Sequence, residues 1–182
     1  LPGTNAALRT QATNGAPEGL VLIAQAQSAG RGRRGHSFFS PPGGLYLSIL
    51  LRPAFSTRQS PQITALAAVA AARAAEQLCG TPIQIKWVND LWKNGKKVCG
   101  ILTESAFRPD GTPDWVIVGI GVNVSQTAAD FSPDVAAIAT SLRMELKGDV
   151  SRDALAQALT AQLAALLKKE EKETTSGRRG EN

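Results

Sequence analysis

The chain has 182 residues, of which 43% are hydrophobic and 19% charged, and its formal net charge is +5. This length suggests one domain whose core needs no disulfide or metal, and the composition excludes a disordered or fibrous protein. Every apolar run ends before the ~18 residues of a membrane span, and two cysteines are too few for a secreted disulfide scaffold, so we expect a cytoplasmic protein.

Patterns in the first 80 residues predict two helices and two strands. A short helix is expected over Asn5–Gln11 with Thr4 as its N-cap. The apolar runs Leu20–Gln25 and Leu45–Leu51 are typical of buried strands. An Ala-rich helix is expected over Ser60–Leu78, because a Ser-Pro pair both caps and starts a helix well.

The second half of the chain predicts three strands and two helices. The strands are Ile83–Trp87, Val98–Ala106 and Asp114–Val124, and the last two should form an antiparallel hairpin because the segment between them is rich in turn residues. Helical spacing of apolar residues predicts helices over Pro133–Leu146 and Ser151–Lys169. The mixture of helices with a hairpin indicates an α+β fold with a mixed, largely antiparallel sheet flanked by helices.

The positive charge is concentrated in two segments. Residues 30–36 carry three arginines and no acid, residues 86–97 carry four lysines and one aspartate, and the remaining residues carry a net charge of −1. A local positive field favours an anionic ligand over a diffuse nucleic-acid surface, although such segments also occur as solvated faces.

The first basic segment, Gly30–Gly35, matches G-x-G-x-x-G but lacks the context of a dinucleotide site. No helix is predicted after it, and no acidic residue lies ~20 positions on to bind a ribose. Glycines allow close approach of backbone N–H groups to an anion, and arginines add charged donors. The loop is therefore suited to phosphates, and we expect it to become ordered when a ligand binds.

Five motifs, in order along most of the chain, resemble those of the biotin protein ligase family. They are Gln27–Gly35 (QSAGRGRRG), Gly44–Ser48 (GLYLS), Lys86–Asp90 (KWVND), Lys97–Glu104 (KVCGILTE) and Gly119–Asn123 (GIGVN). The resemblance implies a catalytic domain with the fold of class II aminoacyl-tRNA synthetases. It also implies that ATP and Mg²⁺ serve to convert biotin to biotinyl-5′-AMP, and that biotin then passes to a lysine of a biotin carboxyl carrier protein.

The resemblance also implies roles for individual residues. Arg33 and Lys97 are the expected catalytic residues, at the carboxylate and α-phosphate. Biotin binding is expected from Thr4, Gln27, Gly30, Arg31, Gly32, Arg33, Lys97 and Gly100. Adenylate binding is expected from Arg33, Arg34, Phe38, Asn89 and Asn123. Asp90 is the expected magnesium-linked residue, and the alternative is that it caps the turn that follows it. For Phe38 the alternative to adenylate binding is that its ring anchors the loop. Whether Lys86 adds positive charge to the site is left open.

The expected organisation is a catalytic domain over residues 1–169 and a disordered tail over residues 170–182. The small C-terminal β domain and the N-terminal DNA-binding domain of the family are expected to be absent, so DNA binding is not expected. Two alternatives stay open: a biotin-binding module without turnover, and transfer of lipoate or octanoate. A homodimer is also left open.

Overall fold

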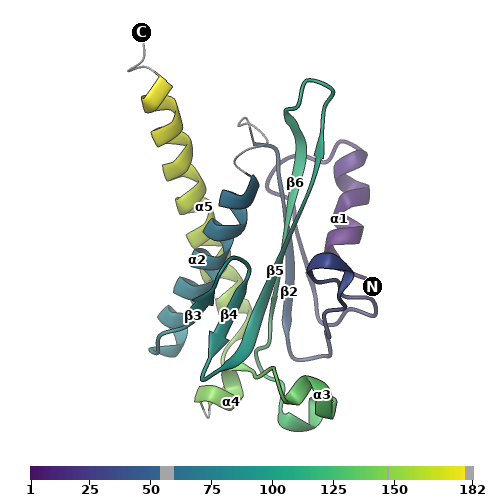
Figure 1. Cartoon of the computed structure of the whole chain (residues 1–182), viewed down its shortest axis with the longest axis vertical. Helices are drawn as coiled ribbons and strands as arrows, with labels where there is room; N and C mark the ends of the chain where they lie inside the picture. The colour runs from purple at the N-terminus through teal and green to yellow at the C-terminus, as the bar shows by residue number, and fades with distance from the viewer. Residues whose placement is uncertain (54–59, 147, 179–182) are drawn as a thin grey trace.

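The computed structural model describes residues 1–53, 60–146 and 148–178, and Figure 1 shows the path of the chain. The helices are α1 (Thr4–Thr13), α2 (Ser60–Cys79), α3 (Pro133–Ala136), α4 (Leu142–Leu146) and α5 (Arg152–Arg178), with short 3-10 helices η1 (Arg33–Gly35) and η3 (Ala128–Asp130). The strands are β1 (Val21–Ala24), β2 (Leu45–Leu51), β3 (Gln84–Lys86), β4 (Asp90–Lys93), β5 (Lys96–Phe107) and β6 (Pro113–Val122). No helix in these ranges is both long and apolar enough to cross a membrane.

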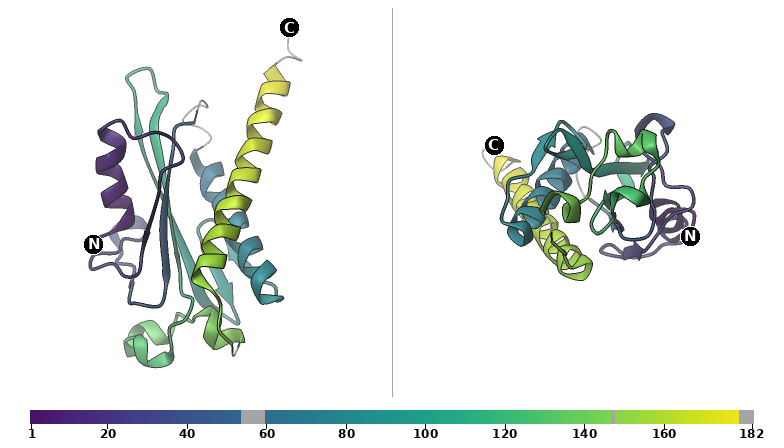
Figure 2. Two further views of the ribbon diagram at one scale, coloured as in Figure 1. Left: turned by 180° about the vertical axis from the view of Figure 1, so that it is seen from behind. Right: turned by 90° about the horizontal axis from the view of Figure 1, so that it is seen from below.

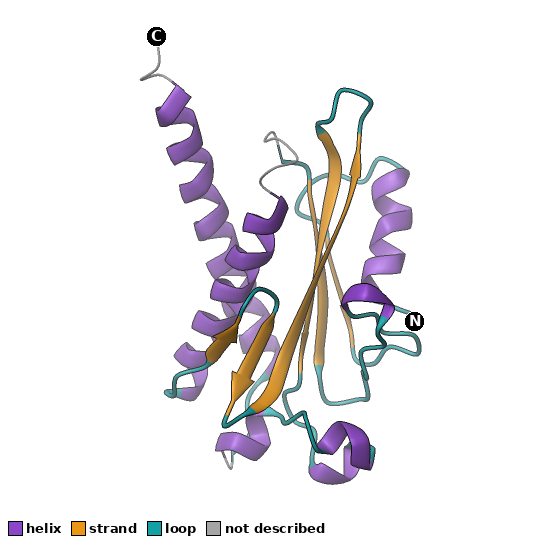
Figure 3. Ribbon diagram, viewed as in Figure 1, coloured by secondary structure: helices purple, strands orange, loops and turns teal. Residues whose placement is uncertain are grey.

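The six strands form one sheet in the order β1-β2-β6-β5-β4-β3, and every neighbouring pair is antiparallel (Figure 3). The predicted α+β class and the β5–β6 hairpin are confirmed. The register places Gly121 between Tyr46 and Gly100 on the neighbouring strands, and Gly119 between Ser48 and Leu102. Because cross-strand neighbours share a face, these residues make two rows on one side of the sheet.

Helices cover the two faces of the sheet differently (Figure 2). On one face α2 and α5 pack over the main core, to which β2 contributes Leu47 and Ile49. On the other face α1 covers only part of the sheet, where Leu8 packs with Leu50 and Ile117. Strand β2 is therefore buried on both sides, which explains its nearly unbroken apolar sequence.

Strand β4 is present in the structure but is not among the strands predicted from the sequence. Only Leu91 of its four residues is buried, so its sequence shows no apolar run. The signal that was available is Asn94-Gly95 between β4 and β5, since both residues have positive φ, as a two-residue hairpin turn requires.

The helix predicted over residues 133–146 is wrong as a single element. It is divided into α3 and α4 by a segment that pairs with the start of β5: Lys97 N–H donates to the Ile138 carbonyl, and Thr140 N–H donates to the Lys97 carbonyl. These backbone bonds to the sheet replace the bonds of a continuous helix.

The remaining differences lie at helix ends. Helix α1 begins at Thr4 with Gly3 as N-cap, so Thr4 is not the cap; its hydroxyl bonds the sheet instead. Helix α5 continues to Arg178, through most of the tail expected to be disordered, while residues 179–182 lie outside the described residues. Its packed first half and an i,i+4 ion pair between Lys169 and Glu173 favour this continuation.

Candidate active site

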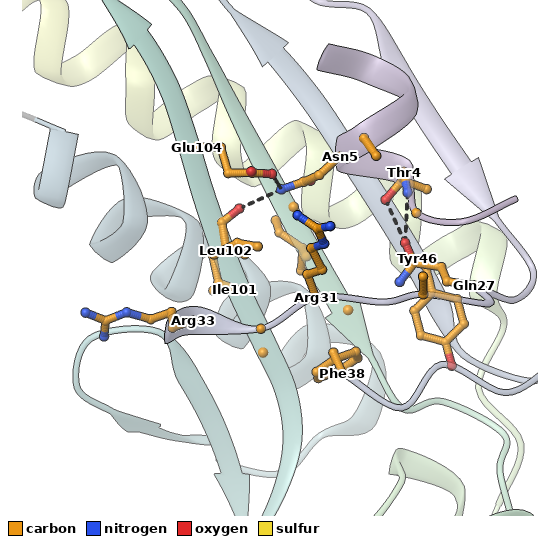
Figure 4. Close-up of a pocket in the computed structure, with 18 of the residues that line it drawn as sticks. Thr4, Asn5, Gln27, Arg31, Arg33, Phe38, Tyr46, Ile101, Leu102 and Glu104 are labelled. Carbon is orange, nitrogen blue, oxygen red and sulfur yellow. Dashed lines mark hydrogen bonds between the residues drawn. The ribbon is translucent and has the colours of Figure 1, made fainter. Parts of the chain in front are cut away.

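A cavity of about 170 Å³ lies between α1, the Arg loop (residues 27–40) and the face of β2, β5 and β6 that α1 leaves uncovered (Figure 4). It draws side chains from segments that are far apart in the sequence. Nine of the predicted site residues line it: Thr4, Gln27, Arg31, Gly32, Arg33, Phe38, Asn89, Lys97 and Gly100.

Glycines make room for the cavity at the sheet. A Cβ atom on Gly119 would lie 2.2 Å from Asn5 Oδ1, and one on Gly121 would lie 2.6 Å from Phe38 Cε1. A Cβ on Gly100 would lie 2.9 Å from Phe38 Cε2. Glycine within a strand usually marks a bulge or a close approach, and here close approach is the reason at all three positions.

The aromatic ring of Phe38 lies on this glycine floor. It packs edge-on against Tyr46, with ring centroids 6.5 Å apart. The Tyr46 hydroxyl donates to the Pro41 carbonyl at 2.7 Å and accepts from the Gln126 amide at 3.1 Å, and burial raises the pKa of the phenol well above its usual range. Phe38 therefore anchors the Arg loop to the sheet, as the alternative for this residue supposed. Its predicted contact with adenine stays a prediction.

Neutral polar groups line the inner end of the cavity, where α1 begins. Gln27 Oε1 accepts from the backbone N–H of Thr4 at 2.8 Å, and Gln27 Nε2 donates to Ser40 at 3.0 Å. The Thr4 hydroxyl lies 2.6 Å from the buried Ser48 hydroxyl. Thr4 and Gln27 were predicted here, and the structure joins them to each other directly.

A charged group lies beside this end. Asn5 donates its amide to the Glu104 carboxylate at 2.8 Å, and Glu104 also forms an ion pair with Arg9. Figure 4 shows Arg31 extending from its loop across the cavity toward Asn5 and Glu104. Arg31 thus extends toward the inner end of the cavity, away from Arg33.

Arg33 and Lys97 bring positive charge to the outer end of the cavity. Arg33 donates to Asn89 Oδ1 at 3.2 Å, which links the Arg loop to the turn between β3 and β4. The Lys97 ammonium lies 2.9 Å from Asp90 Oδ1 and 5.6 Å from the centroid of the Phe38 ring. Two cations at one end of a partly enclosed site suit an anionic reacting group.

Asp90 lies in the structure as the partner of Lys97. Its Oδ1 is buried and, in the described part of the chain, has no hydrogen bond apart from this ion pair. No group of three or more His, Cys, Asp or Glu side chains within those residues could hold a metal ion. Magnesium is usually held by one or two carboxylates together with substrate phosphates, so the magnesium-linked role of Asp90 stays a prediction.

Besides Asp90, three predicted residues do not line the cavity. Gly30 lies behind it, where a Cβ would be 2.3 Å from the Phe38 carbonyl oxygen, so it allows the Arg loop to fold back on itself. Arg34 has a φ of 55° and an exposed side chain. The buried Asn123 donates to the Thr140 carbonyl at 3.0 Å and so holds the segment between α3 and α4.

The second basic segment is only partly at the cavity. Lys86 lies 4.1 Å from the centroid of the Trp92 ring, Lys93 donates to Thr81 at 2.6 Å, and Lys96 donates to the Ala136 carbonyl at 2.8 Å. Only Lys97 of the four lysines lines the cavity. From the two basic segments, Arg31, Arg33 and Lys97 thus line the cavity, and their roles toward biotin and the adenylate stay predictions.

Sequence reasoning gave no role to Asn5, Arg9, Tyr46 or Glu104, all of which line the cavity. Tyr46 and Glu104 lie within the quoted motifs, and their alternation with apolar residues on β2 and β5 could have placed them on the opposite face from the main core. No sequence signal indicates that Asn5 and Arg9 of α1 approach a glutamate 95 or more positions away.

Comparison with known proteins identifies relatives of this chain. A model of the "Biotin/lipoate A/B protein ligase family" matches residues 4–123. A "Bifunctional ligase/repressor BirA" of Bacillus subtilis is 40% identical over 158 residues, which cover 86% of this chain and 48% of that protein. A "Biotin--[acetyl-CoA-carboxylase] ligase" of Paracoccus denitrificans is 39% identical over 119 residues, which cover 64% of this chain and 47% of that protein.

Solved structures agree with these matches. The biotin protein ligase of Aquifex aeolicus, in complex with biotin and ATP, has a TM-score of 0.78 and 30% identity, covering 92% of this chain and 67% of that one. The chain spans about half the length of the curated relatives just named.

Proposed function

The chain belongs to the biotin/lipoate A/B protein ligase family, with the fold of a biotin protein ligase catalytic domain, and we propose that it activates biotin with ATP. The product is biotinyl-5′-AMP, and the biotinyl group then passes to a lysine of a biotin carboxyl carrier protein. The observation that carries this proposal is the division of the cavity into two ends. The inner end offers the neutral hydrogen-bonding groups of Thr4 and Gln27, and the outer end carries the cations Arg33 and Lys97.

In the first half-reaction a carboxylate oxygen of biotin attacks the α-phosphorus of ATP, and pyrophosphate leaves. Both reactants are anions, so they approach only where positive charge offsets their repulsion. Lys97 supplies that charge and is held by its ion pair with Asp90, while Arg33 supplies a second charge on the Arg loop.

The uncharged ring of biotin would lie at the inner end, against Thr4 and Gln27. This orientation directs the carboxylate toward Lys97. In the second half-reaction the acceptor amine attacks the acyl carbonyl, and AMP leaves with its phosphate near the same cations. The carrier protein is therefore the expected macromolecular partner.

The proposal is tested by incubating the protein with biotin, magnesium and ATP labelled at the α-phosphate. Labelled biotinyl-adenylate is expected, together with release of pyrophosphate. A folded protein that forms no adenylate at saturating substrates would contradict the proposal, and calorimetric binding of biotin in that sample would indicate a binding module without turnover.

The family description includes lipoate ligases, so lipoate is the alternative substrate. The polar inner end disfavours it, because the dithiolane ring of lipoate offers no hydrogen-bond donors for Thr4 or Gln27. Competition between biotin and lipoate for the same cavity distinguishes the two substrates.

A further inference from the structure

A continuous chain of hydrogen bonds runs from Glu104 to the inner end of the cavity. The amide nitrogen of Asn5 lies 2.8 Å from Glu104 Oε2 and 3.3 Å from the Leu102 carbonyl oxygen. The carboxylate of Glu104, which is paired with Arg9, and a backbone carbonyl can only accept. The Asn5 side chain is therefore held with its NH₂ group toward Glu104 and its carbonyl oxygen toward β2.

This orientation of Asn5 decides where the next two protons lie. Asn5 Oδ1 is 2.6 Å from the Ser48 hydroxyl, and because an amide oxygen only accepts, Ser48 must donate its single proton to it. Ser48 Oγ is also 2.6 Å from Thr4 Oγ1. Since the proton of Ser48 is already used, Thr4 must donate its own proton to Ser48.

The result is a pair of oxygen atoms at the cavity with no proton between them. Thr4 Oγ1 lies 3.2 Å from Gln27 Oε1, and that amide is itself held with its oxygen inward because it accepts from the Thr4 backbone N–H. The opposite proton order would leave the 2.6 Å contact of Ser48 with Asn5 without a proton. Repulsion falls with distance, so the order imposed by Glu104 places the unprotonated contact at the longest of the three oxygen separations.

We propose that Glu104 is a positioning residue that fixes the direction of this relay, so that the inner end of the cavity presents hydrogen-bond acceptors to a ring bearing N–H donors. One such donor placed against Thr4 Oγ1 and Gln27 Oε1 satisfies both oxygens. Ser48 is fully buried, so solvent does not reorient the relay at its centre. The inference rests on the proposed function, because it assigns a ring N–H of biotin as that donor.

Two variants interrupt the relay at different points. Glu104→Gln replaces a group that only accepts by one that also donates, so the orientation of the Asn5 amide then depends on the longer contact with the Leu102 carbonyl alone. Ser48→Ala removes the central hydroxyl. The matched control is Thr103→Val, which changes the neighbouring residue of β5 on the opposite face, where Thr103 bonds Thr64 of α2.

The first measurement compares the affinity of biotin with that of a biotin methylated on a ring nitrogen, by calorimetry. The wild-type protein and Thr103→Val are expected to prefer biotin. Glu104→Gln and Ser48→Ala are expected to reduce that preference about threefold to tenfold, the range for one hydrogen bond. A merely structural role would weaken both ligands equally, and that result would overturn the proposal.

The second measurement does not depend on biotin. The side-chain NH₂ resonances of Asn5 in ¹⁵N-labelled protein are assigned by their loss in Asn5→Asp. They are expected to shift in Glu104→Gln and in Ser48→Ala but not in Thr103→Val. Resonances unaffected by Ser48→Ala would overturn the relay. If the two variants show these shifts but the wild-type protein binds no biotin, only the proposed function is contradicted.

Discussion

At the scale of single residues, the two arginines of the Arg loop that enter the cavity serve different ends of it. Arg33 bonds Asn89, close to the segment that holds Asp90 and Lys97, whereas Arg31 extends toward Asn5 and Glu104. A motif with repeated arginines cannot show this, because alternate positions of an irregular loop have no fixed direction.

Arg33→Ala should loosen the retention of biotinyl-adenylate more than it weakens biotin binding, because Arg33 lies at the cationic end of the cavity. Charged hydrogen bonds contribute about 1.5–3 kcal/mol each, so an increase of about tenfold or more in the adenylate dissociation rate is expected. Arg34→Ala is the control, since it removes the same charge from the same loop outside the cavity. Equal losses of biotin and adenylate affinity in Arg33→Ala would contradict the assignment.

Gly121→Ala should displace Phe38 from the floor of the cavity, because the new methyl group would lie 2.6 Å from the ring. We expect a loss of about 1–3 kcal/mol in the free energy of unfolding, as for other overpacked sites, and a weaker affinity for biotin. Chemical denaturation and calorimetry measure the two effects. Gly148→Ala is the control, since its nearest neighbouring atom is at 3.9 Å, and an unchanged Gly121→Ala protein would refute the close-approach argument.

At the scale of elements, the position of α1 determines whether a site exists. This helix carries Thr4, Asn5 and Arg9, and its apolar side covers part of one face of the sheet, around Leu50, Trp115 and Ile117. Its far end is held by Arg52 at the end of β2, whose guanidinium donates to carbonyl groups of Ala12, Ala16 and Asp114.

Arg52→Met should release this end of α1 while retaining most of the apolar part of the side chain. Because several carbonyl groups lose a charged donor, we expect the free energy of unfolding to fall by about 2–4 kcal/mol. Thermal or urea unfolding measures the loss. Arg108→Met is the comparison, because this more exposed arginine forms a surface ion pair with Asp114 and should change stability by less than about 1 kcal/mol. Similar values for the two variants would show that the clamp on α1 adds no stability.

At the scale of the whole molecule, the core between the sheet, α2 and α5 buries a thiol that lies directly behind the cavity. Burial raises the pKa of Cys99 from about 9 to about 12, and the phenol of Tyr46 is shifted in the same direction for the same reason. A pKa higher in the folded state than in the unfolded state means that the unfolded state loses its proton first as pH rises.

The stabilisation from these buried protonated groups is therefore fully present below about pH 9 and should be lost progressively toward pH 12. Denaturant unfolding at pH 7 and at pH 11 should show lower stability at the higher pH. Cys99→Ala should reduce that difference, because it removes one of the two titrating groups. A pH dependence identical to that of the wild-type protein would contradict the contribution of Cys99.

The sequence by itself determined the fold class, the family resemblance and nine of the residues that line the cavity. Local patterns predict the strand Leu45–Leu51 and the β5–β6 hairpin, because an apolar run and a turn segment each consist of residues that are adjacent in the sequence. The pairing of strands with separated helices then brings Thr4, Gln27, Arg33 and Lys97 together, as the family motifs had implied.

Only the tertiary structure decided which groups each side chain contacts and whether it donates or accepts a hydrogen bond there. It placed Arg34 and Asn123 outside the cavity, gave Lys97 a partner in Asp90, and joined Asn5 to Glu104 across 99 positions of the chain. The physical reason is that hydrogen-bond direction depends on which groups meet in space. An amide or a hydroxyl can donate or accept until a neighbour that can do only one of these fixes the choice.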